Sequence, residues 1–176
     1  MSEAKPPLWR RPLDALASSR LGAALLRPVL HRLDRPLLRL SGGRVATTLG
    51  LPTLLLTTTG RRSGVPRSAP LLYLKRGEDL VVIGTRFGST RHPAWYLNLR
   101  AHPEAQVLLA GATFGVRARE ATPGEREEIW AQATRLYGGY ERYRSRVGAR
   151  RIPILILSPA GSAGGSLPEP GGLASR

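Results

Sequence analysis

Residues 53–74 read TLLLTTTGRRSGVPRSAPLLYL, and this stretch decides the fold of the chain. The segment Thr53–Thr59 combines leucines with β-branched threonines, the composition of a buried strand. A glycine-flanked turn, GRRSG, follows it, and the chain is apolar again over 69–74, so the stretch predicts a β-hairpin. Pro66 and Pro70 cannot donate ladder hydrogen bonds, which indicates an edge or a bulge of the sheet.

Short apolar stretches separated by turn residues continue along the chain. We expect further strands at 80–85, 105–109, 113–120 and 152–157. One helix is predicted from Pro93 to about 100, and a second begins at the capping box formed by Thr122 and Glu125 and runs to about 136. Antiparallel strands joined by short turns predict a mainly β (α+β) fold, a barrel with short flanking helices.

The composition divides the chain into three zones. Residues 1–44 are predicted to form a basic amphipathic helical arm, because apolar residues recur there at helical spacing opposite three arginines. Residues 45–158 form the barrel domain, and residues 159–176, rich in Pro, Gly, Ser and Ala, are expected to be disordered. Two interpretations of the arm stay open: contact with an anionic membrane surface through residues 10–40, or ordinary packing on the barrel.

The overall composition suits one folded domain with a strong preference for anions. The chain has 176 residues, 41% of them hydrophobic, and no cysteine. Its 27 basic residues against 12 acidic ones give a net charge of +15, which attracts nucleic acid, an anionic membrane or a polyanionic cofactor. No apolar run approaches the roughly 20 residues of a membrane-spanning helix, and no signal peptide is evident, so we expect a cytoplasmic protein.

Several kinds of chemistry have no support in the sequence. There is no phosphate-binding Walker motif and no GxGxxG after a strand. His31, His92 and His102 stand apart, so no metal site is expected. Acidic residues are scarce in the domain, which argues against paired-carboxylate hydrolysis. An enzyme without these groups would depend on a borrowed organic cofactor.

The turn after the first strand is a candidate anion site. Arg61, Arg62 and Arg67 crowd a glycine-flanked turn with no acidic residue nearby. Backbone amides and guanidinium groups bind phosphate and carboxylate oxygens. The alternative is a hairpin turn whose charges are simply solvated.

Two further segments could contact a heterocycle. In the segment 85–103, Trp95 and Asn98 are three residues apart and can share a helix face, although a core tryptophan and a surface asparagine are the simpler interpretation. In YGGYERYRSR, Tyr137, Tyr140 and Tyr143 could pack against an aromatic acceptor and donate hydrogen bonds to it, or could fill a core.

These segments run in the order and at the spacing of one family. With TTTGRRSGVPRSAPLLYL, HPAWYLNLRAHP, YGGYERYRSR and RIPILIL, residues 45–158 resemble the deazaflavin (F420)-dependent nitroreductases and quinone reductases. The resemblance implies a split β-barrel and coenzyme F420, an 8-hydroxy-5-deazaflavin whose tail carries a phosphodiester and glutamates. It implies hydride transfer from the reduced cofactor to a quinone or nitroaromatic acceptor. It also implies membrane association through the arm in some members.

The resemblance assigns roles to individual residues. The cofactor-binding residues are Arg61, Arg62, Ser63, Arg67, Pro70, Thr85, Arg86, Trp95 and Asn98. The catalytic, acceptor-side residues are Tyr140, Tyr137, Tyr143 and Thr85, with Tyr140 the first choice for a hydrogen bond to the acceptor oxygen. Phe87 departs from the small, Gly-rich loop of the family, and its bulk bears on the size and orientation of the acceptor.

Three alternatives to this function remain at the level of sequence. A flavin mononucleotide (FMN) protein on the same barrel would also need arginines at its phosphate. A non-enzymatic anion- or membrane-binding domain would suit the charge, but the chain lacks the interleaved basic and aromatic residues of a nucleic-acid surface. A family member could also store or protect the cofactor with little activity.

Overall fold

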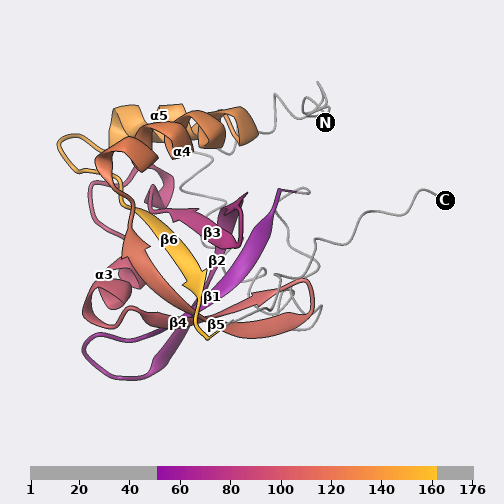
Figure 1. Ribbon diagram of the computed structural model, residues 1–176. Coiled ribbons are helices and arrows are strands. Elements are labelled where there is room, and N and C mark those ends of the chain that lie inside the picture. The colour runs from indigo at the N-terminus through magenta and orange to yellow at the C-terminus, as the bar shows by residue number, and fades with distance from the viewer. Residues whose placement is uncertain (1–50, 162–176) are drawn as a thin grey trace.

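The fold of this chain is a closed six-stranded barrel (Figure 1). The computed structural model describes residues 51–161, so the predicted arm and all but the first residues of the predicted tail lie outside the described part. The strands are β1 (Thr53–Thr59), β2 (Pro66–Arg76), β3 (Asp79–Ile83), β4 (Glu104–Leu109), β5 (Ala112–Glu120) and β6 (Ile154–Pro159). They close in the order β1-β2-β3-β6-β5-β4 with every described pair antiparallel, which confirms the predicted fold class.

Short helical segments flank the barrel. They are η1 (Arg86–Gly88), α3 (Ala94–Ala101), α4 (Pro123–Leu136) and α5 (Gly139–Arg146). Figure 1 shows α4 and α5 together on the outside of the barrel, with α3 in a different position. Within the described residues, no helix combines the length and the apolar character that crossing a membrane requires.

Strand β2 is longer than predicted, and its pairing shows how it accommodates two prolines. Residues 66–72 pair with β1, whereas 73–76 pair with β3. Pro66 and Pro70 therefore lie in the part of β2 that, among the described strands, pairs with β1 alone. An absent N–H costs little at an edge of this kind.

Several predicted strand ends were wrong, and two of them lie at one contact. Strand β3 stops at Ile83 instead of Thr85, and β6 begins at Ile154 instead of Ile152. The Gly84 N–H donates to the carbonyl oxygen of Pro153 at 2.8 Å, and the chain then turns into η1. Pro153 itself has no N–H to continue the ladder.

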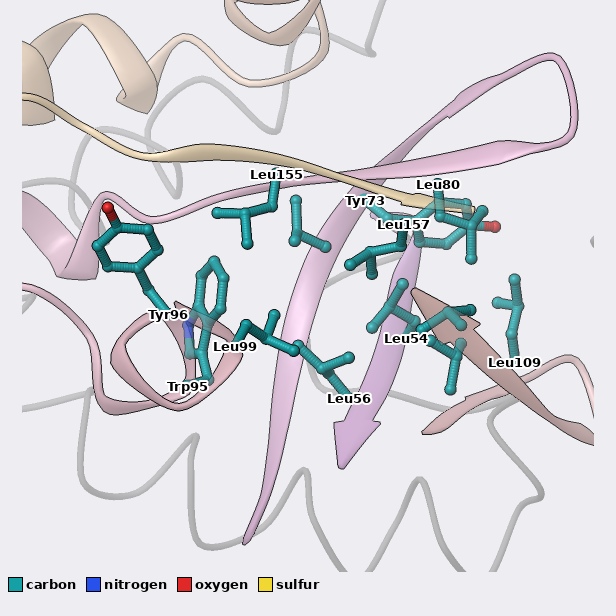
Figure 2. Close-up of a cluster of buried hydrophobic side chains, with 13 residues drawn as sticks. Leu54, Leu56, Tyr73, Leu80, Trp95, Tyr96, Leu99, Leu109, Leu155 and Leu157 are labelled. Carbon is teal, nitrogen blue, oxygen red and sulfur yellow. The ribbon is translucent and has the colours of Figure 1, made fainter. Parts of the chain in front are cut away.

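The apolar run of β6 is buried on both faces. Leu155 and Leu157 point into the barrel, whereas Ile154 and Ile156 belong to a second core beneath α4 and α5. This alternation is the period-two geometry of a strand. Figure 2 shows the inner core, where Trp95 from α3 lies beside the leucines of the strands.

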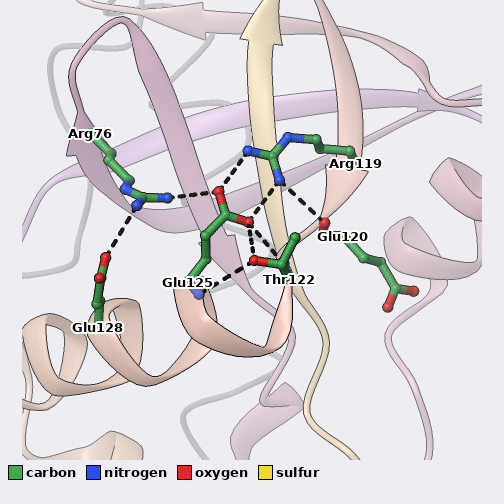
Figure 3. Close-up of polar contacts among 6 residues, drawn as sticks. All are labelled: Arg76, Arg119, Glu120, Thr122, Glu125 and Glu128. Carbon is green, nitrogen blue, oxygen red and sulfur yellow. Dashed lines mark hydrogen bonds and ion pairs between the residues drawn. The ribbon is translucent and has the colours of Figure 1, made fainter.

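The start of α4 is tied to the barrel by the predicted capping box (Figure 3). The Thr122 N–H donates to the Glu125 carboxylate at 2.8 Å. The same carboxylate accepts from Arg119 of β5 at 2.8 Å and from Arg76 of β2 at 2.9 Å. One carboxylate therefore caps the helix and joins it to two strands.

Candidate anion-binding groove

A groove of about 460 Å³ lies where the β1–β2 turn, the loop after β3 and the start of α3 meet. Its lining residues are Arg61, Arg86, Thr90, Arg91, His92, Ala94, Leu97 and Arg150. Four of these are arginines, and none of these described lining residues carries a carboxylate. Such an accumulation of positive charge attracts anions.

The N-terminus of α3 adds to this positive field. The helix begins at Ala94, which lines the groove, and its N-cap is Pro93, whose side chain makes no capping hydrogen bond. The first N–H groups of a helix carry a partial positive charge and bind phosphate or carboxylate oxygens. Helix and arginines therefore favour the same ligand chemistry.

Asn98 fixes the β1–β2 turn to α3. Its side chain is buried, its Oδ1 accepts from the Arg61 N–H at 3.1 Å, and its Nδ2 donates to Thr58 Oγ1 at 3.0 Å. Both ends of the carboxamide are therefore used within the protein. This brace sets where the Arg61 side chain enters the groove.

The loop after β3 has an unusual backbone. Arg86 and Phe87 both adopt left-handed conformations, with φ of 49° and 55°. Non-glycine residues rarely adopt this conformation, and it costs about 1–3 kcal/mol at each position. The Arg86 guanidinium lines the groove and donates to the His92 carbonyl at 2.9 Å, whereas the Phe87 ring contacts Tyr143 edge-on at 6.0 Å.

The titratable groups in the groove share one electrostatic environment. Burial lowers the pKa of His92, and the charges of Arg150 and Arg100 lower it further. Burial also lowers the pKa of Arg150, with a smaller effect from Arg86. His92 Nδ1 is buried and has no hydrogen-bond partner among the described residues. Because cations oppose one another here, a bound anion would relieve their repulsion.

The predicted cofactor-binding residues lie in several places. Arg61 and Arg86 line the groove. Three others, Arg62, Ser63 and Arg67, are exposed on the hairpin. Three are buried outside the groove lining: Pro70 in β2 opposite Leu55, Thr85 before η1, and Trp95 in the barrel core.

The three predicted tyrosines belong to the second core beneath α4 and α5, called the outer core below. Tyr137, Tyr140 and Tyr143 are 8%, 5% and 4% exposed, and none of them lines the groove. The hydroxyls of Tyr137 and Tyr143 lie 3.3 Å apart. Burial is the main cause that raises the pKa of Tyr140 and of Tyr143, so both phenols stay protonated at neutral pH.

Sequence reasoning missed six lining residues, namely Thr90, Arg91, His92, Ala94, Leu97 and Arg150. The basic pair before Pro93 carried a usable signal, since it precedes a helix start without a capping side chain. Arg150 carried none. Its partners in the loop after β3 lie 61 to 66 residues away in the sequence.

Comparison with known proteins identifies the family. A family model described as F420H(2)-dependent quinone reductase matches residues 30–159. An F420H(2)-dependent quinone reductase of Mycobacterium tuberculosis (strain ATCC 25618 / H37Rv) is 31% identical over 134 residues, which are 73% of this chain and 89% of that protein.

Solved structures agree with this match. The F420-H2 dependent reductase FDR-A is 32% identical with a TM-score of 0.56, covering 61% of this chain and 94% of that one. Another structure, described as a domain-swapped dimer, is 28% identical with a TM-score of 0.58, covering 77% and 98%. The chain belongs to the F420H(2)-dependent quinone reductase family.

Proposed function

We propose that this protein is an oxidoreductase that transfers hydride from reduced coenzyme F420 to a quinone. Family membership supports the cofactor and the reaction. The observation that carries the proposal in the structure is the groove, whose described lining residues include four arginines and no carboxylate. A tail with a phosphodiester and glutamates is the kind of polyanion that such a donor set fits.

The residues divide the binding of the cofactor between them. Arg61, Arg86, Arg91 and Arg150 would hold anionic oxygens of the tail, with the start of α3 as a further donor. The exposed Arg62, Ser63 and Arg67 lie on the same hairpin as Arg61 and would extend this surface. The remaining predicted residues are buried outside the groove lining and would support the residues that line it; they are Pro70, Thr85, Trp95 and Asn98.

The reduced deazaflavin, when bound, supplies the hydride for the acceptor. The protein's own task is to orient the acceptor and to stabilise the negative charge that develops on its oxygen. Tyr140 is proposed for this role because burial raises the pKa of its phenol and keeps it protonated, although the side chain is 5% exposed and lies outside the groove lining. Tyr137 and Tyr143 share a hydroxyl contact and would support it. The buried hydroxyl of Thr85, before η1, is a second candidate donor.

The acceptor is proposed to be a flat ring that carries electronegative oxygens. Quinones and nitroaromatic compounds share this shape, and aromatic side chains pack against it. Phe87 packs edge-on against Tyr143, so its bulk would bear on the size and orientation of an acceptor that reached the tyrosines. A nitroaromatic acceptor is the finer part of the proposal, since the family name specifies quinones.

A peripheral location on the inner face of the cell membrane is a further part of the proposal. Its support is the net charge of +15 and the basic, amphipathic sequence of residues 10–40. Co-sedimentation with vesicles of anionic phospholipid, absent with neutral vesicles and lost at high salt, is the expected result. Equal recovery with both kinds of vesicle would remove this part.

The test is a fluorescence titration of purified protein with F420, followed by menadione added to the reduced complex. We expect saturable F420 binding and oxidation of the reduced deazaflavin that depends on menadione. FMN serves as the control ligand, because the flavin alternative predicts a yellow protein that binds FMN in preference. Absence of F420 binding would overturn the proposed function.

A further inference from the structure

The loop between Gly84 and Ser89 adopts a conformation that its own residues disfavour. Arg86, Phe87 and Gly88 are consecutive left-handed residues, with φ of 49°, 55° and 78°. Only glycine adopts this region without a steric penalty. Such a loop persists where surrounding groups hold it in place.

Arg150 supplies three hydrogen bonds to this loop. Its Nε donates to the Ser89 carbonyl at 3.0 Å, its Nη1 to the Gly84 carbonyl at 3.0 Å, and its Nη2 to the Thr85 carbonyl at 2.9 Å. The bonds reach the carbonyls on both sides of the left-handed residues. The planar guanidinium has donors in the fixed directions that this arrangement requires, and a lysine ammonium does not.

The loop conformation directs two neighbouring side chains to different parts of the molecule. Arg86 enters the groove and bonds to the His92 carbonyl, whereas Phe87 packs against Tyr143 in the outer core. The loop therefore connects the groove to the core cluster that contains Tyr137, Tyr140 and Tyr143. A shift of its backbone would move Arg86 and Phe87 together.

We infer that Arg150 is a positioning residue of the cofactor site, which holds the loop at 84–89 so that Arg86 is directed into the groove. The inference deepens the proposed function and rests on it for the identity of the ligand. The side chain also lines the groove itself, so it contributes charge as well as geometry. The variant Arg150→Lys separates these two contributions because it keeps the charge and loses the three-carbonyl geometry.

The first readout needs no cofactor. Within the loop, the Gly88 N–H donates to Thr85 and the Ser89 N–H to Arg86, each at 3.1 Å. In Arg150→Lys we expect these two amides to exchange with solvent at least about tenfold faster by NMR, because the loop opens more often. Arg151→Lys is the matched control, since Arg151 is the exposed neighbour in sequence, and its exchange rates should equal those of the wild type.

The second readout separates cofactor binding from turnover. In Arg150→Lys, the Kd and KM for F420H2 should rise about tenfold, with kcat at saturating cofactor within about twofold of the wild type. Arg150→Ala should lose more affinity. Millimolar guanidinium, but not methylammonium, should restore that affinity because it can occupy the vacated donor position.

The outcomes distinguish this inference from the proposed function. Wild-type protein that fails to bind F420 removes the proposed function, while the exchange experiment still decides whether Arg150 holds the loop. Unchanged exchange in Arg150→Lys overturns the inference whatever the cofactor does. Faster exchange with unchanged F420 affinity overturns it too, because the loop would then not position the site.

Discussion

Arg61 contributes to the groove through its backbone and through its side chain. Its backbone N–H is held by Asn98 at 3.1 Å, while its side chain lines the groove. The neighbouring Arg62 is also exposed on the turn but is not among the groove-lining residues. Arg61 and Arg62 are therefore two adjacent arginines of one turn that differ in whether their side chains line the groove.

We predict that Arg61→Met weakens F420 binding by about 10- to 100-fold, the loss of one or two charge-assisted hydrogen bonds. Arg62→Met, which removes an exposed charge on the same turn but outside the groove lining, should weaken binding by a smaller factor, about threefold. Isothermal titration of both variants measures the difference. Equal losses in the two variants would show that overall charge, not the groove, determines affinity.

Tyr140 tests the proposed acceptor side. Phenylalanine fills the same space, so Tyr140→Phe should leave the melting temperature and the F420 Kd nearly unchanged. Turnover with menadione should fall about 100-fold, because a donor to the developing oxygen charge is lost. Stopped-flow oxidation of the bound cofactor gives the rate directly. Unchanged turnover would exclude this role for Tyr140.

Among the elements, the eight residues of α3 contribute to the barrel core, to the groove and to the β1–β2 turn. Trp95 and Leu99 fill the barrel core, Ala94 brings the helix start to the groove, and Asn98 braces the hairpin turn. The core packing fixes the helix, and the fixed helix then places the polar groups. The site is therefore supported by the barrel interior.

Asn98→Leu should reduce the free energy of unfolding by about 2–4 kcal/mol, because the Arg61 N–H and the Thr58 hydroxyl lose a buried partner. Asn98→Asp keeps an acceptor for the Arg61 N–H and should retain more F420 affinity than the leucine variant. Urea unfolding and F420 titration measure the two effects. Equal F420 affinity in both variants would show that the turn does not depend on this brace.

The capping box of α4 predicts a pH dependence of stability. Hydrogen bonds from Arg119 and from the Thr122 N–H lower the pKa of Glu125 well below its ordinary value of 4.5. A carboxyl group with a lowered folded-state pKa stabilises the protein above its unfolded-state pKa, and this contribution disappears as the pH falls through the folded-state pKa.

We therefore expect Glu125→Gln to be less stable than the wild type at pH 7 in urea unfolding. The difference should shrink progressively below about pH 4.5 as the wild-type carboxylate becomes protonated. Glu128→Gln is the control, since Glu128 is 73% exposed and pairs with Arg76 alone among the described ion pairs. A difference that is independent of pH would mean that the charge of Glu125 contributes nothing.

For the whole molecule, the net charge is +15, and no carboxylate is found among the described residues that line the groove. An excess of positive charge raises the association rate of a negatively charged ligand. Salt screens this attraction, with a screening length of about 10 Å at 0.1 M. The charge therefore acts on encounter, whereas the groove acts on the bound state.

The association rate for F420 should fall about tenfold between roughly 20 mM and 500 mM NaCl, with a smaller change in the dissociation rate. Stopped-flow fluorescence resolves the two constants. A salt effect confined to dissociation would assign the charge to local contacts in the groove.

The sequence by itself determined the elements of this protein and its family. The hairpin predicted at 53–74, the capping box of Thr122 and Glu125 and the apolar run of β6 follow from local propensity and pattern, which the nearby residues specify. The end of β3 and the start of β6 were misplaced in the prediction. The Gly84–Pro153 hydrogen bond, which lies just beyond both, joins segments that are distant in the sequence.

Only the tertiary structure decided the composition of the groove. Arg61 and Arg86 were foreseen, but Arg150 reaches the loop at 84–89 through barrel closure, and no local pattern encodes that contact. The structure likewise placed Trp95 in the core and used both ends of Asn98 within the protein. Local sequence specifies which elements form, whereas the directions of side chains depend on how the closed barrel brings those elements together.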